Sequence, residues 1–440
     1  MKRPSAVAIL GCGTVGGATA ALLLSQRSML AAKTGLDIEL RYIVDKDFSH
    51  AESLNLDPGL FETELDKVLA DPDVLAVVEL IGGTGIARTL TEKILRAGKR
   101  VVTANKALLA KHGAELMAVA REAGVSISFE ASCGGGIPIL RALYDGILPN
   151  RIDAFYGIVN GTCNYILTEM MQKGNSYQEA LREAQEAGLA EADPTLDVTG
   201  GDSAHKLAIM SSLAFAQRVD LESVPVQGID SLKLIDLNFG RELGYVVKLL
   251  AIAQSEEDGL ALRVRPAFIS TEHPLAWVSG PFNAVSVYGH AVGHTMYYGR
   301  GAGGSPTASA VTADIISSCM GTADTVFSTL NIWPDRTKKA VLLPQEDIQG
   351  RYYVRLMVED QPGVFAQIAG ILGENQISLS SVLQKEPYND KADAVPVVIT
   401  THSVREGNLR TALAALDKLP VVREPSICIE ILDEHEEIFA

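Results

Sequence analysis

The chain has 440 residues, more than one compact core ordinarily holds, and this length suggests about three domains. Its formal net charge of −16 argues against a nucleic-acid partner and against an anionic membrane, because both require clustered Lys and Arg. The composition, 47% hydrophobic and 21% charged with no long biased tract, is typical of a folded globular protein.

Cysteine usage and hydropathy bear on the compartment. The five cysteines are scattered without a C-x-x-C pair, which favours reduced thiols over a disulfide framework or a zinc site. No uninterrupted apolar run approaches the roughly 18 residues of a membrane span. We therefore expect a cytoplasmic protein with no membrane partner.

The N-terminal segment carries a glycine pattern. A short buried strand is predicted at Val7–Leu10, and an Ala- and Leu-rich helix from about Ala18 to Leu30. Between them lies a G-x-G-x-x-G turn, the arrangement expected of a dinucleotide site, where the backbone approaches a pyrophosphate at a helix N-terminus. The candidate cofactor-binding residues of this turn are Gly11, Gly13, Thr14, Val15 and Gly16.

A second predicted strand, residues 39–44, ends at Asp45. A carboxylate at this position can accept hydrogen bonds from the adenosine ribose hydroxyls, which favours NAD. Lys46 could instead meet the 2′-phosphate of NADP, and a solvated Asp-Lys-Asp turn is a third interpretation. The sequence leaves NAD or NADP open, with a mild preference for NAD.

Further strands at 74–80, 100–103 and 126–130 alternate with helices and indicate an α/β domain. Asn105 and Lys106 follow the 100–103 strand directly. Open parallel sheets bind ligands at the carboxyl ends of their strands, so both residues are candidates for contact with a nicotinamide or a substrate.

Three consecutive glycines, Gly134 to Gly136, lie in the segment from Glu130 to Pro138. Such a loop can bind phosphate through its N–H groups or a hard cation through its carbonyl groups. It can equally serve only as a hinge between domains, and the residues alone do not decide between these functions.

The segment 188–209 concentrates charge. Glu191, Asp193 and Asp197 precede a predicted helix on which Asp202 and Lys206 share one face. Carboxylates can hold a substrate ammonium group while a lysine protonates the oxygen of an aldehyde during hydride transfer. The alternative is a solvent-exposed ion pair, which is common and contributes little.

Two later features need separate interpretations. His290 and His294 are four residues apart, but the surrounding pattern predicts a β-hairpin in place of a metal-binding helix. The glycine-rich run 299–306 opens an apolar helix, a second glycine-to-helix junction. It could pack against the cofactor or merely against the sheet.

Beyond a linker predicted at 334–350, the pattern becomes a βαββαβ unit, which is ferredoxin-like. Its predicted elements are strand 352–358, helix 363–374, strands 377–383 and 394–401, helix 406–419 and strand 426–432. The turn at Asp360–Val364 offers N–H groups at a helix start to a small carboxylate ligand. We expect this module to be separable, so that removal of residues from about Pro344 onward leaves an active core.

Taken together, these segments resemble homoserine dehydrogenase over nearly the whole chain, and the tail resembles an ACT domain, an amino-acid-binding module. The resemblance rests on the following segments: Gly11–Gly16, Thr103–Lys106, Glu130–Pro138, Asn160–Tyr165, Gly188–Lys206 and Gly299–Gly304. The run from Asn160 to Lys206 is its most specific part.

The resemblance implies reversible NAD(P)H-dependent reduction of L-aspartate 4-semialdehyde to L-homoserine, in threonine and methionine biosynthesis. It implies that Lys206 is the proton donor, with Asp202 beside it. Glu191 and Asp197 would hold the substrate amino group, and Lys106 would lie at the nicotinamide and the substrate.

The resemblance also implies two further sites. Gly303 would contact the cofactor. A sodium ion would be bound largely by main-chain carbonyl groups of four residues: Glu130, Cys133, Gly135 and Ile137.

The expected domains are a Rossmann-type NAD(P)-binding domain at 1–135, completed by a returning helix at 301–330, and an α+β catalytic and dimerisation domain at 136–300. The linker at 334–350 and an ACT regulatory domain at 351–435 follow.

The expected assembly is a homodimer or homotetramer, with threonine as the feedback effector. Two rivals remain: a dehydrogenase with another amino-acid-like substrate, and a non-catalytic nucleotide-binding sensor, against which the presence of both Lys206 and Asp202 argues.

Overall fold

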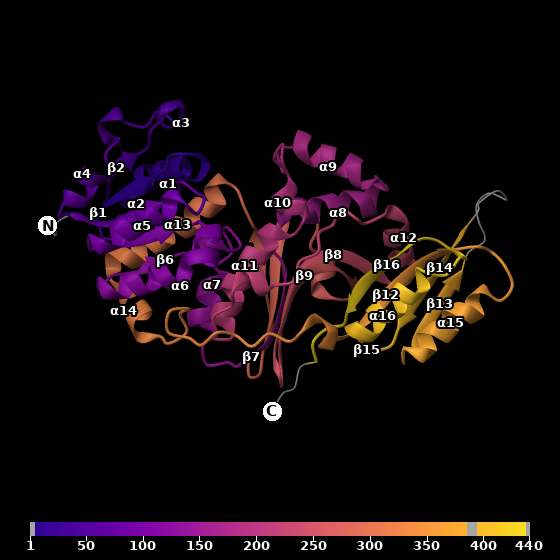
Figure 1. The fold of residues 1–440 in the computed structure, drawn as a ribbon. Coiled ribbons are helices and arrows are strands. Elements are labelled where there is room, and N and C mark those ends of the chain that lie inside the picture. Colours follow the sequence, from indigo (N-terminus) through magenta and orange to yellow (C-terminus); the bar gives the residue numbers. More distant parts are fainter. Residues whose placement is uncertain (1–4, 385–393, 437–440) are drawn as a thin grey trace.

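The computed structural model describes residues 5–384 and 394–436 (Figure 1). Its N-terminal part is a parallel sheet of six strands in the order β3-β2-β1-β4-β5-β6. The strands are β1 Ser5–Leu10, β2 Ile38–Val44, β3 Phe61–Glu62, β4 Val74–Glu79, β5 Arg100–Thr103 and β6 Ile127–Ser128. The central strands are almost continuously apolar and buried, as a parallel sheet covered on both faces requires. The predicted Rossmann-type α/β fold class is confirmed.

Helices from two separate segments of the chain, residues 14–122 and 304–329, cover this sheet. They are α1 Thr14–Ser25, α2 Arg27–Thr34, α3 Ser49–Ser53, α4 Leu65–Ala70, α5 Ile86–Arg96, α6 Lys106–Glu122, and, returning late in the chain, α13 Gly304–Met320 and α14 Thr322–Thr329. The predicted single helix from Ala18 to Leu30 is wrong, because the chain breaks at Gln26 into two helices. The returning segment likewise breaks at Gly321, whose φ of +77° ends α13.

The middle part carries the other face of the candidate site. Its strands are β7 Ile152–Ile158, β8 Tyr245–Glu256, β9 Gly259–Ser270, β10 Phe282–Gly289 and β11 Gly293–Arg300, and its helices are α7 Ile139–Arg141, α8 Gly161–Lys173, α9 Tyr177–Glu186, α10 Thr195–Val198, α11 Gly201–Ala214 and α12 Leu234–Glu242. The hairpin predicted around His290 and His294 is confirmed, since β10 and β11 pair antiparallel with Tyr288 opposite His294. The helix predicted from Gly201 is confirmed as α11.

The C-terminal part has the predicted βαββαβ order. Its elements are β12 Gln349–Val358, α15 Val364–Glu374, β13 Leu379–Gln384, β14 Val395–Thr401, a two-residue strand β15 Val404–Arg405, α16 Glu406–Leu416 and β16 Val422–Leu432. Residues 385–393 of the predicted module lie outside the described residues.

The C-terminal and middle parts share one sheet. Strand β16 pairs in parallel with β9, aligning Glu430 with Ala267 and Leu432 with Ile269, so the strand order runs β11-β10-β7-β8-β9-β16-β12-β14-β13. In Figure 1 the two parts accordingly lie edge to edge. The predicted module therefore shares a sheet with the middle part, and the activity of a truncated core stays a prediction.

The segment predicted as a linker runs bonded along the middle part. Arg218 donates its backbone N–H to Lys338 at 2.8 Å, and Leu260 donates to Val341 at 2.8 Å. Strand β12 already begins at Gln349.

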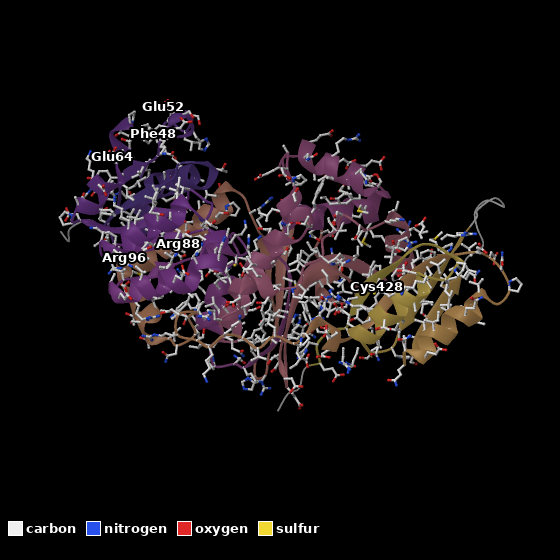
Figure 2. All side chains as sticks on the ribbon, in the orientation of Figure 1. Phe48, Glu52, Glu64, Arg88, Arg96 and Cys428 are labelled. Atoms are coloured by element: carbon white, nitrogen blue, oxygen red, sulfur yellow. The ribbon has the colours of Figure 1, made fainter. Side chains whose placement is uncertain are left out.

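The surface charge of α5 and the hydropathy of the helices bear on nucleic-acid and membrane partners. Arg88 and Arg96 on α5 (Figure 2) are partly exposed, and each pairs with a glutamate, Glu115 and Glu92 respectively, so their charge is balanced locally. Within the described residues, no helix is long and apolar enough to cross a membrane.

Candidate active site

The glycine turn between β1 and α1 is shaped for a close approach by a ligand. Gly11 has φ +98°, and a Cβ added at Gly16 would lie 2.0 Å from the Gly11 carbonyl oxygen, so neither position accepts a side chain. A Cβ at Gly13, in contrast, would have no neighbour within 4 Å. Gly13 caps α1 without a side-chain hydrogen bond, so the first N–H groups of Thr14 and Val15 remain available to an anion.

Asp45 lies beside this turn. One carboxylate oxygen accepts the Cys12 backbone N–H at 2.6 Å and the other accepts that of Lys46 at 2.7 Å. Asp45 thus fastens the glycine turn to the end of β2. Each carboxylate oxygen can accept more than one hydrogen bond, so a ribose hydroxyl can still be bound there.

Polar side chains at the carboxyl ends of β4 and β5 fix the position of Lys106. The fully buried carboxylate of Glu79 accepts from Thr103 Oγ1 at 2.7 Å. Asn105 caps α6, accepting from Leu108 N at 3.1 Å while its amide donates to the Gly83 carbonyl at 2.7 Å. Both functions of the Asn105 side chain are therefore engaged, and what it does in this structure is fix the helix that begins with Lys106.

Three charged side chains meet where α6 of the Rossmann-type part packs against α11 of the middle part. Lys106 Nζ lies 2.9 Å from Asp202 Oδ1, and Lys206 Nζ lies 2.7 Å from Asp202 Oδ2. Lys206 also donates to the Val159 carbonyl at 2.5 Å. The Asp202 and Lys206 side chains are only 5% and 10% exposed, so the interpretation as a solvent-exposed ion pair is wrong.

The charges in this cluster stabilise the ionised forms of Asp202 and Lys106. Burial alone would raise the pKa of Asp202, but Lys206 and then Lys106 hold it well below its usual range. Burial disfavours the Lys106 ammonium, yet the attraction of Asp202 outweighs it and raises the pKa of Lys106. One carboxylate is thus shared by two ammonium groups.

Asn160 and Asp197 extend the cluster. The Asn160 amide donates to Asp197 Oδ1 at 2.7 Å and to Asp202 Oδ2 at 2.9 Å. Burial raises the pKa of Asp197, and the hydrogen bond from Asn160 counteracts that rise. Sequence reasoning missed Asn160 as a site residue. It opens the most specific segment of the resemblance, but its physical signal was only that of a good helix-capping residue after a buried strand.

Glu191 differs from Asp197 and Lys106, the other two predicted substrate residues. Its side chain is exposed on the loop between α9 and α10, and among the described residues it makes no hydrogen bond or ion pair. The structure therefore does not bring Glu191 into the cluster that contains Asp197.

The loop that follows β6 connects the two parts of the site. The Glu130 carboxylate is used internally, since it accepts the backbone N–H groups of Leu140 and Arg141 at 2.9 and 2.8 Å. Burial raises the pKa of the Cys133 thiol to about 12, so it stays protonated. A Cβ at Gly135 would lie 2.5 Å from the Gly301 carbonyl oxygen, which requires glycine there.

Gly303, predicted to contact the cofactor, is brought to the glycine turn. It has φ +114° and caps α13, which packs along α1. A Cβ on the next residue, Gly304, would lie 3.3 Å from the Thr14 carbonyl oxygen. The second glycine-to-helix junction thus lies beside the first, and α13 also packs against β4 and β5 of the sheet, as one of the two expectations had it. Contact of Gly303 with the cofactor stays a prediction.

Metal ligation by side chains finds no support. In the residues that the structure describes, no group of three or more His, Cys, Asp and Glu side chains could hold a metal ion. Among the same residues, no hydrogen bond reaches the carbonyl oxygens of Cys133 and Gly135.

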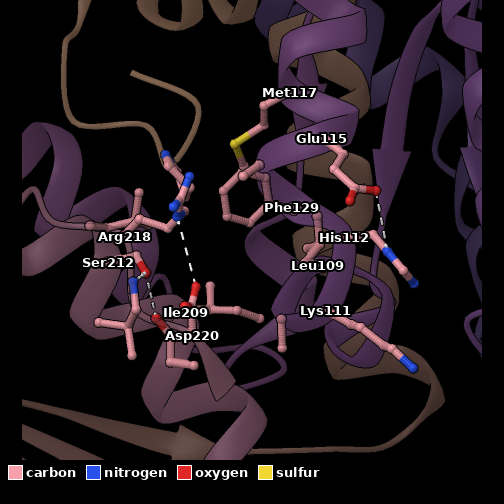
Figure 3. A pocket seen from close by; sticks show the side chains of 17 residues that line it. Leu109, Lys111, His112, Glu115, Met117, Phe129, Ile209, Ser212, Arg218 and Asp220 are labelled. Atoms are coloured by element: carbon pink, nitrogen blue, oxygen red, sulfur yellow. Dashed lines mark hydrogen bonds and ion pairs between the residues drawn. The ribbon is translucent and has the colours of Figure 1, made fainter. Parts of the chain in front are cut away.

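A cavity of about 220 Å³ lies between α6 and α11 (Figure 3). Its walls include Leu109, Phe129 and Ile209, and the Arg218–Asp220 pair lies on one side. None of the predicted site residues lines it. It is a hollow farther along the same two helices, separate from the lysine cluster.

Comparison with known proteins covers all three parts of the chain. The model of the NAD-binding domain of homoserine dehydrogenase matches residues 11–130, that of homoserine dehydrogenase matches 138–316, and that of the ACT domain matches 352–421. The homoserine dehydrogenase of Pseudomonas aeruginosa is 41% identical over 434 residues, covering 98% of this chain and 99% of its own. That of Bacillus subtilis is 40% identical and covers 95% and 96%.

Solved structures of homoserine dehydrogenases are also similar to this chain. The crystal structure of a homoserine dehydrogenase from Thiobacillus denitrificans has a TM-score of 0.92 and 40% identity, covering 98% of this chain and 99% of its own. A hyperthermophilic archaeal homoserine dehydrogenase in complex with NADPH has a TM-score of 0.61 and 25% identity, covering 72% of this chain and 98% of its own.

Proposed function

The chain belongs to the homoserine dehydrogenase family and is an NAD(P)-dependent enzyme of amino-acid biosynthesis, and we propose that Lys206, Asp202 and Lys106 form its catalytic centre. The observation that carries this proposal is the single buried carboxylate of Asp202 between two ammonium groups, at the junction of the nucleotide-binding and middle domains.

Lys206 is the proposed proton donor. The cofactor, when bound, supplies the hydride that reduces the aldehyde carbon. An ammonium group has three N–H donors, and Lys206 directs two of them at Val159 and Asp202. The third can donate to the aldehyde oxygen and deliver the proton as that oxygen becomes a hydroxyl. In the reverse direction, neutral Lys206 takes the hydroxyl proton of homoserine.

Asp202 lies between the two lysines, and its attraction raises the pKa of Lys106. Lys106, at the first turn of α6 and 35% exposed, retains N–H donors for substrate or nicotinamide. The glycine turn and Gly303 would hold the cofactor pyrophosphate and the adjoining part of the dinucleotide through backbone groups, because no side chain obstructs Gly13.

Asp197 is the proposed anchor for the substrate ammonium group, and Glu191, which lies outside the cluster in this structure, is proposed as a second anchor on the resemblance alone. We expect Asp197→Asn and Glu191→Ala each to raise KM for homoserine by about tenfold, the factor of one charge-assisted contact, with kcat less affected. Steady-state kinetics with homoserine measures this. Glu186→Ala, an exposed carboxylate at the end of α9, is the control and should leave KM unchanged. An unchanged KM in either anchor variant removes that residue from the role.

The cofactor is NAD or NADP, and we expect a mild preference for NAD. An ionised Asp45 repels a 2′-phosphate, although exposed Lys46 offsets part of that repulsion. Asp45→Ser should improve kcat/KM with NADP relative to NAD, while its hydroxyl can still accept a backbone N–H. Assays of homoserine oxidation with each cofactor test this. A wild-type enzyme that strongly prefers NADP would show that Lys46 outweighs Asp45.

A sodium ion held by main-chain carbonyl groups of Glu130, Cys133, Gly135 and Ile137 is a further proposal. The glycines at positive φ and the free carbonyl oxygens of Cys133 and Gly135 support it. The Glu130 carboxylate and the Cys133 thiol are not available as ligands, so the ion would be bound by the backbone of this loop.

Assembly, regulation and location complete the proposal. The middle domain would form a homodimer or homotetramer, and the family's biosynthetic role together with five unpaired cysteines supports a cytoplasmic enzyme.

The ACT domain would bind threonine as a feedback effector, with its carboxylate at Asp360–Val364. There Gly363, at φ +89°, caps α15 without a side-chain hydrogen bond and leaves N–H groups open.

A further inference from the structure

Asn160 lies where three elements of the middle domain meet. It follows β7 and is buried. Its side-chain oxygen caps α8 by accepting the Cys163 backbone N–H at 2.8 Å. Its amide nitrogen donates to Asp197 of α10 and to Asp202 of α11. A carboxamide has two N–H donors, and here both are directed at carboxylates.

The first turn of α8 also fastens the backbone of the segment that carries Asp197. Thr162 Oγ1 donates to the Leu189 carbonyl at 2.7 Å, and Cys163 Sγ lies 3.2 Å from the Asp197 carbonyl oxygen. These contacts fix the backbone. The Asn160 amide acts on the Asp197 side chain itself, and so determines where its charge lies.

Two carboxylates within hydrogen-bonding distance of one nitrogen repel each other. Asp202 is compensated by Lys106 and Lys206, as described above. Asp197 is half-buried and has no lysine within ion-pairing distance among the described residues, so the Asn160 amide is its close polar partner. The shared amide favours the ionised form of both acids and holds their side chains at a fixed separation.

We propose that Asn160 is a positioning residue for the reaction: its carboxamide holds Asp197 and Asp202 side by side, so that one carboxylate faces the substrate ammonium group while the other faces the two lysines. The proposal rests on the anchoring role assigned to Asp197 under the proposed function.

Two variants separate this role from helix capping. Serine and aspartate are both good N-cap residues, and aspartate adds a favourable charge at a helix N-terminus. If Asn160 only caps α8, Asn160→Asp should be at least as good as Asn160→Ser. If Asn160 bridges the carboxylates, the order reverses, because both variants lose the two donors and Asn160→Asp also adds a third negative charge.

We expect KM for homoserine to rise about tenfold in Asn160→Ser and further in Asn160→Asp, with a smaller fall in kcat. The pH dependence of kcat/KM supplies a second readout. Loss of the amide removes an interaction that lowers the pKa of Asp197, so its carboxylate protonates at a higher pH. The acid limb of the profile should therefore move to higher pH, and farther in Asn160→Asp.

The controls make each outcome decisive. Ser176 forms the capping box of α9 away from the cluster, so Ser176→Ala reports what loss of a cap alone does: a lower unfolding midpoint with unchanged KM and pH profile. Folded Asn160 variants with wild-type KM and acid limb, or Asn160→Asp matching Asn160→Ser, would overturn the proposal. If Asp197→Asn leaves KM unchanged, the anchoring role fails first; if it raises KM and the Asn160 variants do not, only the present proposal fails.

Discussion

Lys206→Ala is expected to fold and bind cofactor but to lose about 10²- to 10⁴-fold in kcat, the usual contribution of a general acid. The variant removes the proposed donor while Asp202 keeps two partners, Lys106 and Asn160. The buried carboxylate is therefore not left alone, and the fold should survive. Steady-state kinetics with homoserine, together with titration of cofactor binding, measures the two properties separately.

Lys111→Ala is the matched control. Lys111 lies on α6 five residues after Lys106, is exposed, and belongs to none of the contacts of the cluster. Its removal should leave kcat near the wild-type value. A near-normal kcat in correctly folded Lys206→Ala would contradict the assignment of Lys206 as proton donor, whatever the control shows.

The nucleotide-binding half of the site was predictable because its signals are local. A buried strand, a G-x-G-x-x-G turn and a helix follow one another within about twenty residues, and steric limits at Gly11 and Gly16 explain why glycine is needed. Asp45 was predicted from its place after the second strand. Its bond to Cys12 was not, because it joins residues 33 apart.

The catalytic half was predictable only in part. The spacing of Asp202 and Lys206 places them on one helix face, but spacing cannot tell a solvated face from a covered one. The structure covers that face with α6, which carries Lys106 nearly a hundred residues earlier. The pairing of Asn160 with Asp197 and Asp202 likewise depends on which elements lie side by side, and residue patterns do not report that.

The junction with the ACT domain shows the same limit. Nothing in the alternation of β9 or β16 indicates that the two strands pair. Pairing buries Arg263 against Glu430 and Arg265 against Glu406. Truncation from Pro344 would remove the carboxylates that pair with both arginines and would expose an edge of β9. We therefore expect an unstable fragment in place of the active core that the sequence suggested. Threonine feedback is therefore measured in the full-length enzyme, where an unchanged rate at millimolar threonine would contradict the effector proposal.

Asp236→Ala is expected to lower the free energy of unfolding by about 3–5 kcal/mol, the usual cost of removing one partner of a buried ion pair. Asp236, on α12 of the middle domain, accepts from Arg355 Nε at 2.6 Å and from Tyr353 Oη at 3.0 Å, both on β12 of the ACT domain. The Asp236 and Arg355 side chains are 0% and 1% exposed, so the variant leaves a buried guanidinium without the carboxylate that accepts its hydrogen bonds.

A second ion pair across the same boundary provides the control for that prediction. Lys233 and Glu424 are 2.8 Å apart but about half exposed, so Lys233→Ala should cost less than about 1 kcal/mol. Asp236→Leu combined with Arg355→Met should recover most of the lost stability, because it removes both charges at once. Denaturant unfolding of the three variants and the wild type measures these differences. If Asp236→Ala unfolds at the same denaturant concentration as Lys233→Ala, the buried pair does not hold the two domains together, and the junction depends on the β9–β16 pairing and the ion pairs of Arg263 and Arg265.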